Sequence, residues 1–444
     1  MEYASKIEQL RVDSLRPYVR NARSHSRRQI RKIAKSIEKF GFVNPVLVSE
    51  DGEIIAGHGR VEAAKLLGLE TVPVIRLWHM GEADRRAYVI ADNKLALDAG
   101  WDREMLATEL QGLVELGYEV ELSGFEIPEV DIVIESVNEA KHDPGPEDIV
   151  PESRESAVSR VGDCWQLGEH RLLCGDAREE AAFSAVLGGE RADVVFTDPP
   201  YNVRMAGNAG GRGRIRHDEF VMASGEMSET EFAAFLKTTL GHAAKMSRDG
   251  AVQFVFMDWR HLHELFTVAR ETYGEILNLC CWNKTNAGMG SLYRSQHELV
   301  LVAKVGTASY RNNVELGRHG RNRTNVWTYQ GMTTVSADRA AEYAQHPTIK
   351  PVALIADALR DVTQRSDIVL DPFGGSGSTI VAAEKIGRRA RVIELDPAYC
   401  DVAVRRWQTF TGKKAKLGLA GEPFEAVEET RSSSSAASAE SESV

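Results

Sequence analysis

The 444-residue sequence contains no run of apolar residues long enough to cross a membrane. Its first residues, MEYASKIEQL, lack the apolar core typical of a signal peptide. The five cysteines form no CxxC pair and show no His/Cys spacing typical of metal ligands. We therefore expect a cytoplasmic protein with reduced thiols, without a bound metal and without a membrane partner.

The sequence also lacks an excess of positive charge. The chain has 54 Lys and Arg against 65 Asp and Glu, which gives a formal net charge of -11 at pH 7. This balance excludes a uniformly basic nucleic-acid coat, although a local basic surface would still allow DNA binding. Residues 1–40 are rich in arginine and lysine, whereas much of the acidic charge lies at 102–155 and in the C-terminal tail.

The length favours two or three domains. Residues 1–100 alternate short apolar strands with helices, and 101–137 are interpreted as a helical extension. The stretch 138–160 is polar and proline-bearing, which predicts a linker. Residues 161–418 have the pattern of an α/β domain. Residues 419–444 are rich in Ser and Glu, so we expect a disordered tail.

The stretch DIVLDPFGGSGST, residues 367–379, combines an apolar strand with a glycine-rich loop and a helix. Glycines let a backbone approach a ligand closely, and a helix start directs free N–H groups toward it. The loop matches neither the Walker phosphate loop nor the full dinucleotide fingerprint. Glu394 ends the next strand, where an acid can hold both ribose hydroxyls. The pattern favours a nucleoside cofactor without a pyrophosphate, with a structural turn and a solvated acid as the alternatives.

A second apolar strand, in DVVFTDPPYNV at 193–203, ends in Asp198, Pro199, Pro200 and Tyr201. Prolines fix φ and cannot donate hydrogen bonds, so this rigid segment can direct a backbone carbonyl outward. One carboxylate and one carbonyl suit an exocyclic amino group with two N–H donors, and Tyr201 can stack on a flat base. A base inside a duplex would have to be flipped out to reach them. An ordinary proline-rich turn is the alternative.

These two strand ends resemble motifs of the amino-group DNA methyltransferases. Residues 198–201 match the DPPY motif, and 373–377 resemble the FxGxG loop for S-adenosylmethionine. Further stretches that resemble the family are LLCGDA (172–177), CWNK…HELVLVAK (281–304), HPTIKP (346–351) and ELDPAYCDVAVRRW (394–407). The catalytic motif precedes the cofactor loop, as in the β class. The resemblance implies a Rossmann-like α/β methyltransferase fold with a permuted motif order.

The resemblance also implies the site residues. Those implied as catalytic are Asp198, Pro199, Pro200 and Tyr201. Those implied as cofactor-binding are Asp176, Lys350, Asp371, Phe373, Gly375, Ser376, Gly377, Ser378, Thr379, Glu394 and Asp396. The amino nitrogen would attack the methyl group of S-adenosylmethionine directly and without a metal, so positioning would supply most of the rate.

The expected substrate is adenine in double-stranded DNA, methylated at N6, because cytosine-N4 enzymes of the family more often carry Ser before Pro-Pro. Cytosine-N4 methylation stays open. An alternative of another class is a ParB-like DNA-binding adaptor with an inactive methylase half, but the intact Asp198, Tyr201 and Glu394 argue against decay. The sequence leaves open the recognition site, a homodimer, a cognate endonuclease, and a role in restriction-modification.

Two stretches between the motifs are candidates for reading DNA. The first, 204–218, is glycine-rich and basic, with Arg204, Arg212, Arg214 and Arg216 as candidates for phosphate contacts. The second, 310–327, mixes arginine, asparagine and aromatic residues, which read base edges, and contributes Arg318, Arg321 and Arg323. A solvated loop is the alternative for each arginine.

Residues 6–95 resemble the ParB-type N-terminal domain, which implies a small α+β ParB/sulfiredoxin-like fold. In that family a glycine-rich box opens a helix and binds nucleotide phosphates; here it is Gly57-His58-Gly59-Arg60. His58 and Gly59 replace charged positions, and the loop lacks the cysteine of sulfiredoxins. A structural helix start is the alternative. No helix-turn-helix is evident after this domain.

Overall fold

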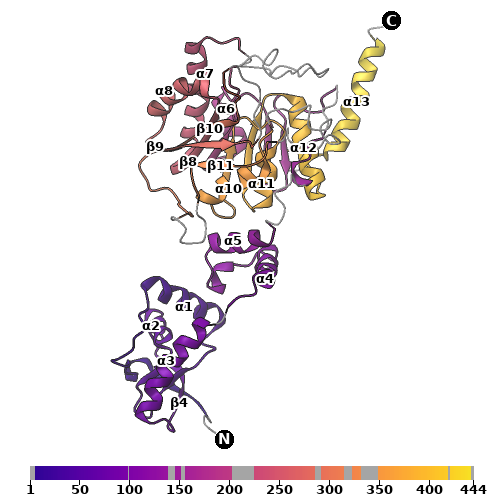
Figure 1. Ribbon diagram of the computed structural model, residues 1–444. Coiled ribbons are helices and arrows are strands. Elements are labelled where there is room, and N and C mark those ends of the chain that lie inside the picture. The colour runs from indigo at the N-terminus through magenta and orange to yellow at the C-terminus, as the bar shows by residue number, and fades with distance from the viewer. Residues whose placement is uncertain are drawn as a thin grey trace. The chain divides into compact units, whose positions relative to one another are not determined.

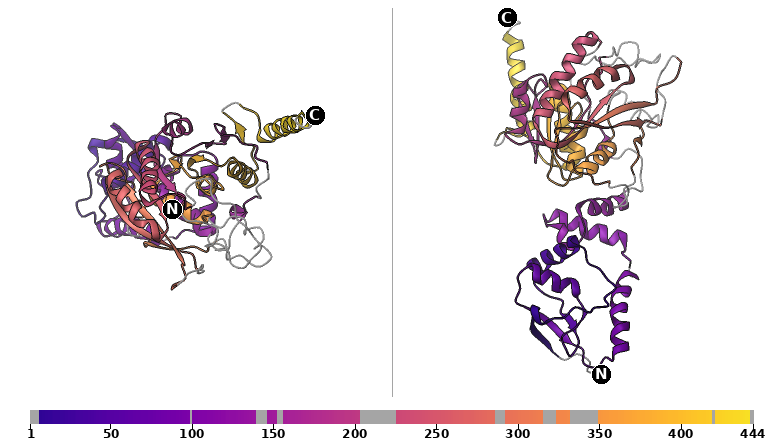
Figure 2. Two further views of the ribbon diagram at one scale, coloured as in Figure 1. Left: turned by 90° about the horizontal axis from the view of Figure 1, so that it is seen from above. Right: turned by 90° about the vertical axis from the view of Figure 1, so that its left-hand side faces the viewer.

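The computed structural model describes residues 6–98, 100–138, 146–151, 156–202, 225–285, 292–314, 323–331, 349–418 and 421–441. Internal contacts divide the chain into two units, Met1–Ala140 and Lys141–Val444. Figures 1 and 2 draw both units. None of the helices in the described ranges combines the length and apolar character needed to cross a lipid bilayer.

Unit 1 is a small α+β domain followed by two helices. Its strands are β1 (Ile7–Arg11), β2 (Val46–Val48), β3 (Ile54–Ala56) and β4 (Thr71–Arg76), and its helices are η1 (Val12–Ser14), α1 (Arg27–Phe40), α2 (His58–Leu66), α3 (Glu82–Asp98), α4 (Arg103–Glu115), η2 (Val120–Ser123) and α5 (Ile127–Asn138). The sheet order is β1-β4-β2-β3. Val72 and Val74 of β4 alternate with outward residues and pack with Val61 of α2 in the core. The small α+β domain predicted from the sequence is therefore present.

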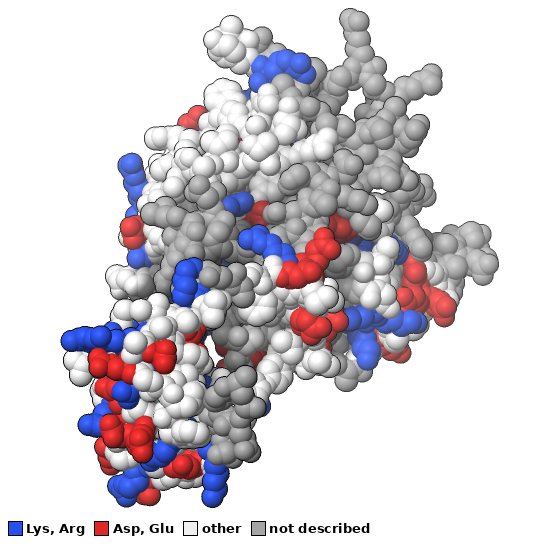
Figure 3. All heavy atoms as spheres, turned by 60° about the horizontal axis from the view of Figure 1, so that its bottom comes forward, with Lys and Arg blue, Asp and Glu red and all other residues white. Residues whose placement is uncertain are grey.

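Several basic side chains of helix α1 form ion pairs within unit 1. Arg28 and Lys32 both pair with Glu126, and Lys32 Nζ donates to the Gly124 carbonyl at 2.8 Å. Lys35 lies 3.7 Å from Glu119. Figure 3 shows Lys and Arg interspersed with Asp and Glu on the face that it draws. The arginine-rich sequence therefore does not translate into a uniformly basic surface on this face.

Unit 2 is built on one ten-stranded sheet, in the order β11-β9-β10-β8-β7-β12-β13-β6-β5-β14. The strands are β5 (Cys164–Leu167), β6 (His170–Cys174), β7 (Ala192–Thr197), β8 (Ser247–Met257), β9 (Glu275–Asn283), β10 (His297–Lys304), β11 (Val326–Thr328), β12 (Ile368–Asp371), β13 (Arg389–Glu394) and β14 (Lys416–Leu417). The helices are η3 (Pro146–Asp148), α6 (Glu180–Leu187), α7 (Glu229–Lys245), η4 (Trp259–His261), α8 (Leu262–Thr272), α10 (Val352–Val362), α11 (Ser378–Lys385), α12 (Pro397–Thr411) and α13 (Phe424–Ser441).

The central strands β8, β7, β12, β13 and β6 are parallel to one another. Strands β12 and β13 come late in the chain yet lie between β7 and β6. The predicted permuted Rossmann-like order is therefore confirmed. In such sheets ligands bind beyond the carboxyl ends of the strands, where the connections diverge. Here that point lies between the ends of β7 and β12.

Helices cover both faces of this sheet, because its central strands are apolar on both sides. Val194 and Phe196 of β7 pack with α10 and α11 on one face. Val195, which points the other way, packs with α6 and with Ala243 of α7. Figure 1 shows these two layers of helices. The sheet is thus rigid on both sides, and the strand ends are held in fixed positions.

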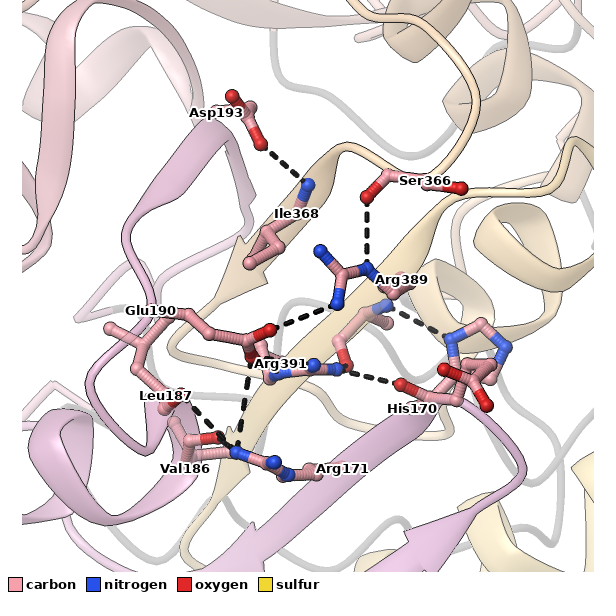
Figure 4. Close-up of polar contacts among 12 residues, drawn as sticks. His170, Arg171, Val186, Leu187, Glu190, Asp193, Ser366, Ile368, Arg389 and Arg391 are labelled. Carbon is pink, nitrogen blue, oxygen red and sulfur yellow. Dashed lines mark hydrogen bonds and ion pairs between the residues drawn. The ribbon is translucent and has the colours of Figure 1, made fainter.

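The amino ends of the parallel strands are joined by a charge cluster, shown in Figure 4. Glu190 accepts from Arg389 at 2.9 Å and from the buried Arg391 at 2.6 Å, and Arg171 lies 3.9 Å away. Asp193 accepts from the backbone N–H of Ile368 at 2.8 Å. Glu190 therefore joins the starts of β6, β7 and β13 at the edge opposite the carboxyl ends.

Parts of the predicted linker and of the tail expected to be disordered pack on unit 2. In the predicted linker 138–160, Asp148 accepts from Val352 N at 3.0 Å, and the buried carboxylate of Asp401 accepts from the backbone N–H groups of Val158 and Ser159. Residues 419–444 were expected to be disordered, but α13 begins at Phe424 and is described to Ser441. The expectation was wrong for this helix because two apolar residues in a Ser/Glu-rich stretch, Phe424 and Val427, are buried.

We expect a fragment of residues 141–432 to be more stable than one of residues 155–420. The shorter fragment loses the cap that Asp148 gives α10 and the burial of Phe424 and Val427. Burial of these two side chains alone stabilises by about 3 kcal/mol or more. Urea denaturation followed by tryptophan fluorescence measures the difference. The fragment 141–444 is the control and should match 141–432, whereas equal stability of the two shorter fragments would contradict the role given to these segments.

Candidate functional site

The two predicted strand ends open into one cavity. Asp198, Pro199, Pro200 and Tyr201 line it from the end of β7, and the loop from Asp371 to Ser376 lines it from the end of β12. Gly375 has φ +49°, and no atom lies within 4 Å of where its Cβ would be. A glycine with this backbone can bring the chain close to a ligand without strain. The structure therefore brings together the two motifs that the sequence placed 170 residues apart.

Asp198 is held by two donors. The Tyr201 hydroxyl donates to Oδ1, and the ammonium group of Lys350 contacts Oδ2. Burial raises the pKa of Asp198, with Glu298 adding to the effect and Lys350 opposing it. Burial alone would lower the pKa of Lys350, but Asp198 and Glu298 together raise it. The lysine is therefore the counter-ion of Asp198.

Glu298 and Lys284 complete this group, and neither was singled out from the sequence. Glu298 Oε2 lies 3.0 Å from Lys350 Nζ and 3.3 Å from the Tyr201 hydroxyl, and Lys284 contacts Oε1. Burial opposes ionisation, but Lys350 and Lys284 lower the pKa of Glu298 to about 2. Both residues lie in the stretch 281–304 noted only as familial. The available signal was a charge at the start of the apolar strand β10.

Asp371 is buried at the end of β12 and binds its own loop. Its carboxylate accepts from Thr379 Oγ1 at 2.6 Å and from Phe373 N at 3.1 Å. Burial raises its pKa to about 7. The residue therefore shapes the loop, while Phe373 and Thr379 also line the cavity.

Glu394 reaches from the end of β13 to the glycine loop. Its two oxygens accept from Gly375 N at 2.6 Å and from Asp396 N at 2.8 Å. Burial raises its pKa to about 7, and Asp396 adds to the rise. Asp396 also caps α12 by accepting from Ala398 N at 2.8 Å. Glu394 therefore lies at the cavity with its carboxylate already oriented by backbone donors.

The loop is held from behind by the buried Arg406 of α12. Its guanidinium donates to Ser376 Oγ at 3.1 Å, to Ser378 Oγ at 2.9 Å and to the Glu147 carbonyl at 3.0 Å. Gly377 is required here for a different reason, because its φ is +80° and a Cβ would lie 2.7 Å from that of Ala403. The serine hydroxyls and Gly377 thus position the loop against α12.

Two candidate residues point elsewhere. Asp176 is bound by Arg178, whose Nε donates at 2.9 Å, and hydrogen bonds from Arg178 hold its pKa below the usual range although partial burial opposes this. Its neighbours Gly175 and Ala177 line the cavity, but Asp176 does not. Arg323 was expected to read DNA; it lies instead between Asp357 and Asp361, at 3.2 and 3.1 Å, with its side chain mostly buried. Its charge is therefore compensated inside the fold.

The other arginines predicted to contact DNA lie outside the described residues: Arg204, Arg212, Arg214, Arg216, Arg318 and Arg321.

In unit 1 the glycine box does open a helix. Gly57 caps α2 with φ +102°, and the helix begins at His58. The His58 ring accepts from Tyr18 N at 3.2 Å, and Arg60 donates to the Asn44 carbonyl at 2.8 Å. Both side chains of the box therefore have partners within the domain.

Comparison with known proteins agrees with this organisation. Residues 192–405 match a family model described as DNA methylase, and residues 2–93 match the ParB N-terminal domain. The chain therefore carries a DNA methylase domain and a ParB N-terminal domain. It is 26% identical over 248 residues to the type II methyltransferase M.HinfI of Haemophilus influenzae. The aligned region covers 53% of this chain and 67% of that protein.

The N-terminal part has its own relative. It is 53% identical over 72 residues to the ParB-like nuclease domain-containing protein YnaK of Escherichia coli (strain K12), covering 16% of this chain and 83% of that protein. Among solved structures, the M1.HpyAVI-SAM complex matches with a TM-score of 0.40 and 20% identity, covering 53% of this chain and 97% of that one.

Residues 104–161 match a ParB-methyltransferase HTH domain. The sequence interpretation, in which no helix-turn-helix was evident, was therefore wrong. The described part of this region contains α4 and α5, with Gly117 and Gly124 in left-handed conformations between them. These glycines were the signal for two packed helices rather than a plain helical extension.

The raised pKa of Asp371 predicts a pH-dependent stability difference between the wild type and Asp371→Asn. The native state holds the proton more tightly than the unfolded state, whose carboxyl has the usual value of 3.8. The stabilisation is therefore complete below that value and is lost as pH rises through about 7. The free energy of unfolding of Asp371→Asn, relative to that of the wild type, should therefore rise by on the order of 2–4 kcal/mol between pH 4 and pH 8.

Urea denaturation of the cofactor-free protein at stepped pH measures this difference. Glu271→Gln, which removes one half of an exposed ion pair with Lys237, serves as the control and should show no such trend. A constant difference between Asp371→Asn and the wild type across this range would show that Asp371 is not the titrating group.

Proposed function

We propose that the protein transfers the methyl group of S-adenosylmethionine to the N6 amino group of an adenine flipped out of double-stranded DNA. The observation that supports this most is the shared cavity. One side presents a carboxylate, a Pro-Pro backbone and a tyrosine ring, and the other presents a glycine loop and an acid. These are the two halves that a transfer between a nucleoside cofactor and a base requires.

The residues present fit the cofactor. The open space above Gly375 can receive its methionine part, and Glu394, oriented by Gly375 N and Asp396 N, can accept from the two ribose hydroxyls. When bound, S-adenosylmethionine supplies an electrophilic methyl group on a sulfonium. Phe373 offers an apolar wall beside it.

The base end of the cavity fits a flat amino-bearing ring. Tyr201 would stack on the base, and Asp198 with a carbonyl of the Pro-Pro segment would accept from its amino group. Acceptors on both N–H bonds draw the nitrogen toward tetrahedral geometry and localise its lone pair for in-line attack. The Asp before Pro-Pro favours adenine-N6, and cytosine-N4 is the second candidate because its amino group has the same donors.

The first test is Asp198→Ala. We expect methyl transfer to fall about a hundredfold or more, because a positioning acceptor is lost. Affinity for S-adenosylmethionine, measured by calorimetry, should change little. Mass spectrometry of hydrolysed DNA identifies the methylated nucleoside, and N4-methylcytosine in place of N6-methyladenine would sink the adenine assignment. Glu271→Gln is the matched control.

The second test is Gly375→Val, which places a side chain where the cofactor would lie. Cofactor affinity should fall at least tenfold, and Glu394→Ala should weaken it as well through loss of the ribose acceptor. Gly412→Val is a matched control, because Gly412 also has a positive φ, +70°, and open space at its Cβ, but does not line the cavity. Wild-type affinity in both Gly375→Val and Glu394→Ala would reduce the loop to a structural turn.

A further inference from the structure

Four side chains of alternating charge lead from the surface to the base end of the cavity. Lys284 pairs with Glu298, and Glu298 pairs with Lys350. Lys350 pairs in turn with Asp198. Exposure of the side chain falls from 30% for Lys284 to 11% for Glu298 and 6% for Lys350, and it is 24% for Asp198, which lines the cavity. Glu298 and Lys284 are not among the residues that line the cavity, so they lie behind Tyr201 and Lys350, which do.

The sheet brings these residues to one edge. Strand β10 is antiparallel to β8, with Leu299 opposite Met257, so Glu298 at its start lies level with the carboxyl ends of β8 and β7. Strand β9 is antiparallel to β10, with Asn283 opposite His297, so Lys284 follows at the same edge. The positions of both charges are therefore fixed by backbone pairing.

Both oxygens of Asp198 are already engaged, Oδ1 by Tyr201 and Oδ2 by Lys350. A target amino group must share or displace one of these donors. Glu298 offers Lys350 a second carboxylate at 3.0 Å, so the ammonium can stay in place while Asp198 turns to the base.

We propose that Glu298 and Lys284 are positioning residues, which set how strongly Lys350 holds Asp198 and thereby the pH at which Asp198 can accept from the target amino group. This inference rests on the proposed function. In the transfer, the nitrogen–methyl bond forms, the sulfur–methyl bond breaks with its electron pair left on sulfur, and the nitrogen then gives up one proton. Asp198 can take that proton only if it is ionised beforehand.

The charged and titratable groups that face Asp198 come from several elements. Tyr201 lies on its own segment, Lys350 precedes α10, Glu298 starts β10 and Asp371 ends β12. Removing the negative charge of Glu298 should free Lys350 for Asp198 and favour its ionised form. Removing the positive charge of Lys284 should let Glu298 draw Lys350 away and favour the protonated form.

The test compares Glu298→Gln with Lys284→Met. The acid limb of kcat against pH, at saturating S-adenosylmethionine and double-stranded DNA, should move to lower pH in Glu298→Gln and to higher pH in Lys284→Met, each by about one pH unit. A merely structural role would lower activity at every pH without opposite displacements. Cofactor affinity by calorimetry should stay as in the wild type in both. Glu271→Gln should move neither readout.

The inference would be overturned if the acid limbs of the two variants moved in the same direction, or if neither moved. If Glu298→Gln fails to fold, Lys284→Met alone decides, because its acid limb must move to higher pH. Infrared spectroscopy follows the carboxyl band lost in Asp198→Asn and reports the same titration without turnover. The shift can therefore be measured even if the wild type methylates no DNA, a result that would count against the proposed function only.

Discussion

The base end of the cavity depends on one buried cation. Lys350 lies between Asp198 and Glu298, with its ammonium 5.0 Å from the ring centroid of Phe256 and 5.8 Å from that of Trp282. Without it, two carboxylates would face each other in a site that is largely removed from water. Leaving a buried charge without its partner typically costs about 3–5 kcal/mol. The lysine is thus needed for the fold of the site before any chemistry takes place.

The permuted strand order places the residues of the site at the ends of neighbouring strands. Asp198 and Asp371 end the adjacent parallel strands β7 and β12, and Glu394 ends β13 beside them. The antiparallel return of β10 adds Glu298 at the same edge. Strand pairing therefore brings together residues that are far apart in the chain. Arg406 then locks the back of the glycine loop to α12 and to the segment around Glu147.

The sequence was most informative where the signal is local. Each strand end, with its Asp-Pro and the residues after it, lies within about a dozen positions, and the two ends do line one cavity. Glu298 and Lys284 could not be found in this way, because their role comes from strand pairing about 100 residues from Asp198. The prediction of a disordered tail failed for α13, because it was based on the high Ser and Glu content and did not consider the two apolar residues that are buried there, Phe424 and Val427. Arg323 misled because an arginine near aromatics suits an internal ion pair as well as a DNA contact.

The acidic groups at and beside the cavity differ in the partners that surround them. Two lysines lower the pKa of Glu298 to about 2, whereas burial raises the pKa of Asp371 and of Glu394, which accept from hydroxyl and backbone donors, to about 7. The lysines thus favour the ionised form of Glu298, whereas burial favours the protonated forms of the two loop acids. A cofactor that carries a positive sulfonium would favour the ionised forms of the loop acids, since an opposite charge nearby lowers the pKa of a carboxyl group. Under the proposed function, the protein therefore supplies its own cation where the neutral base binds and leaves the loop end to be compensated by the cofactor.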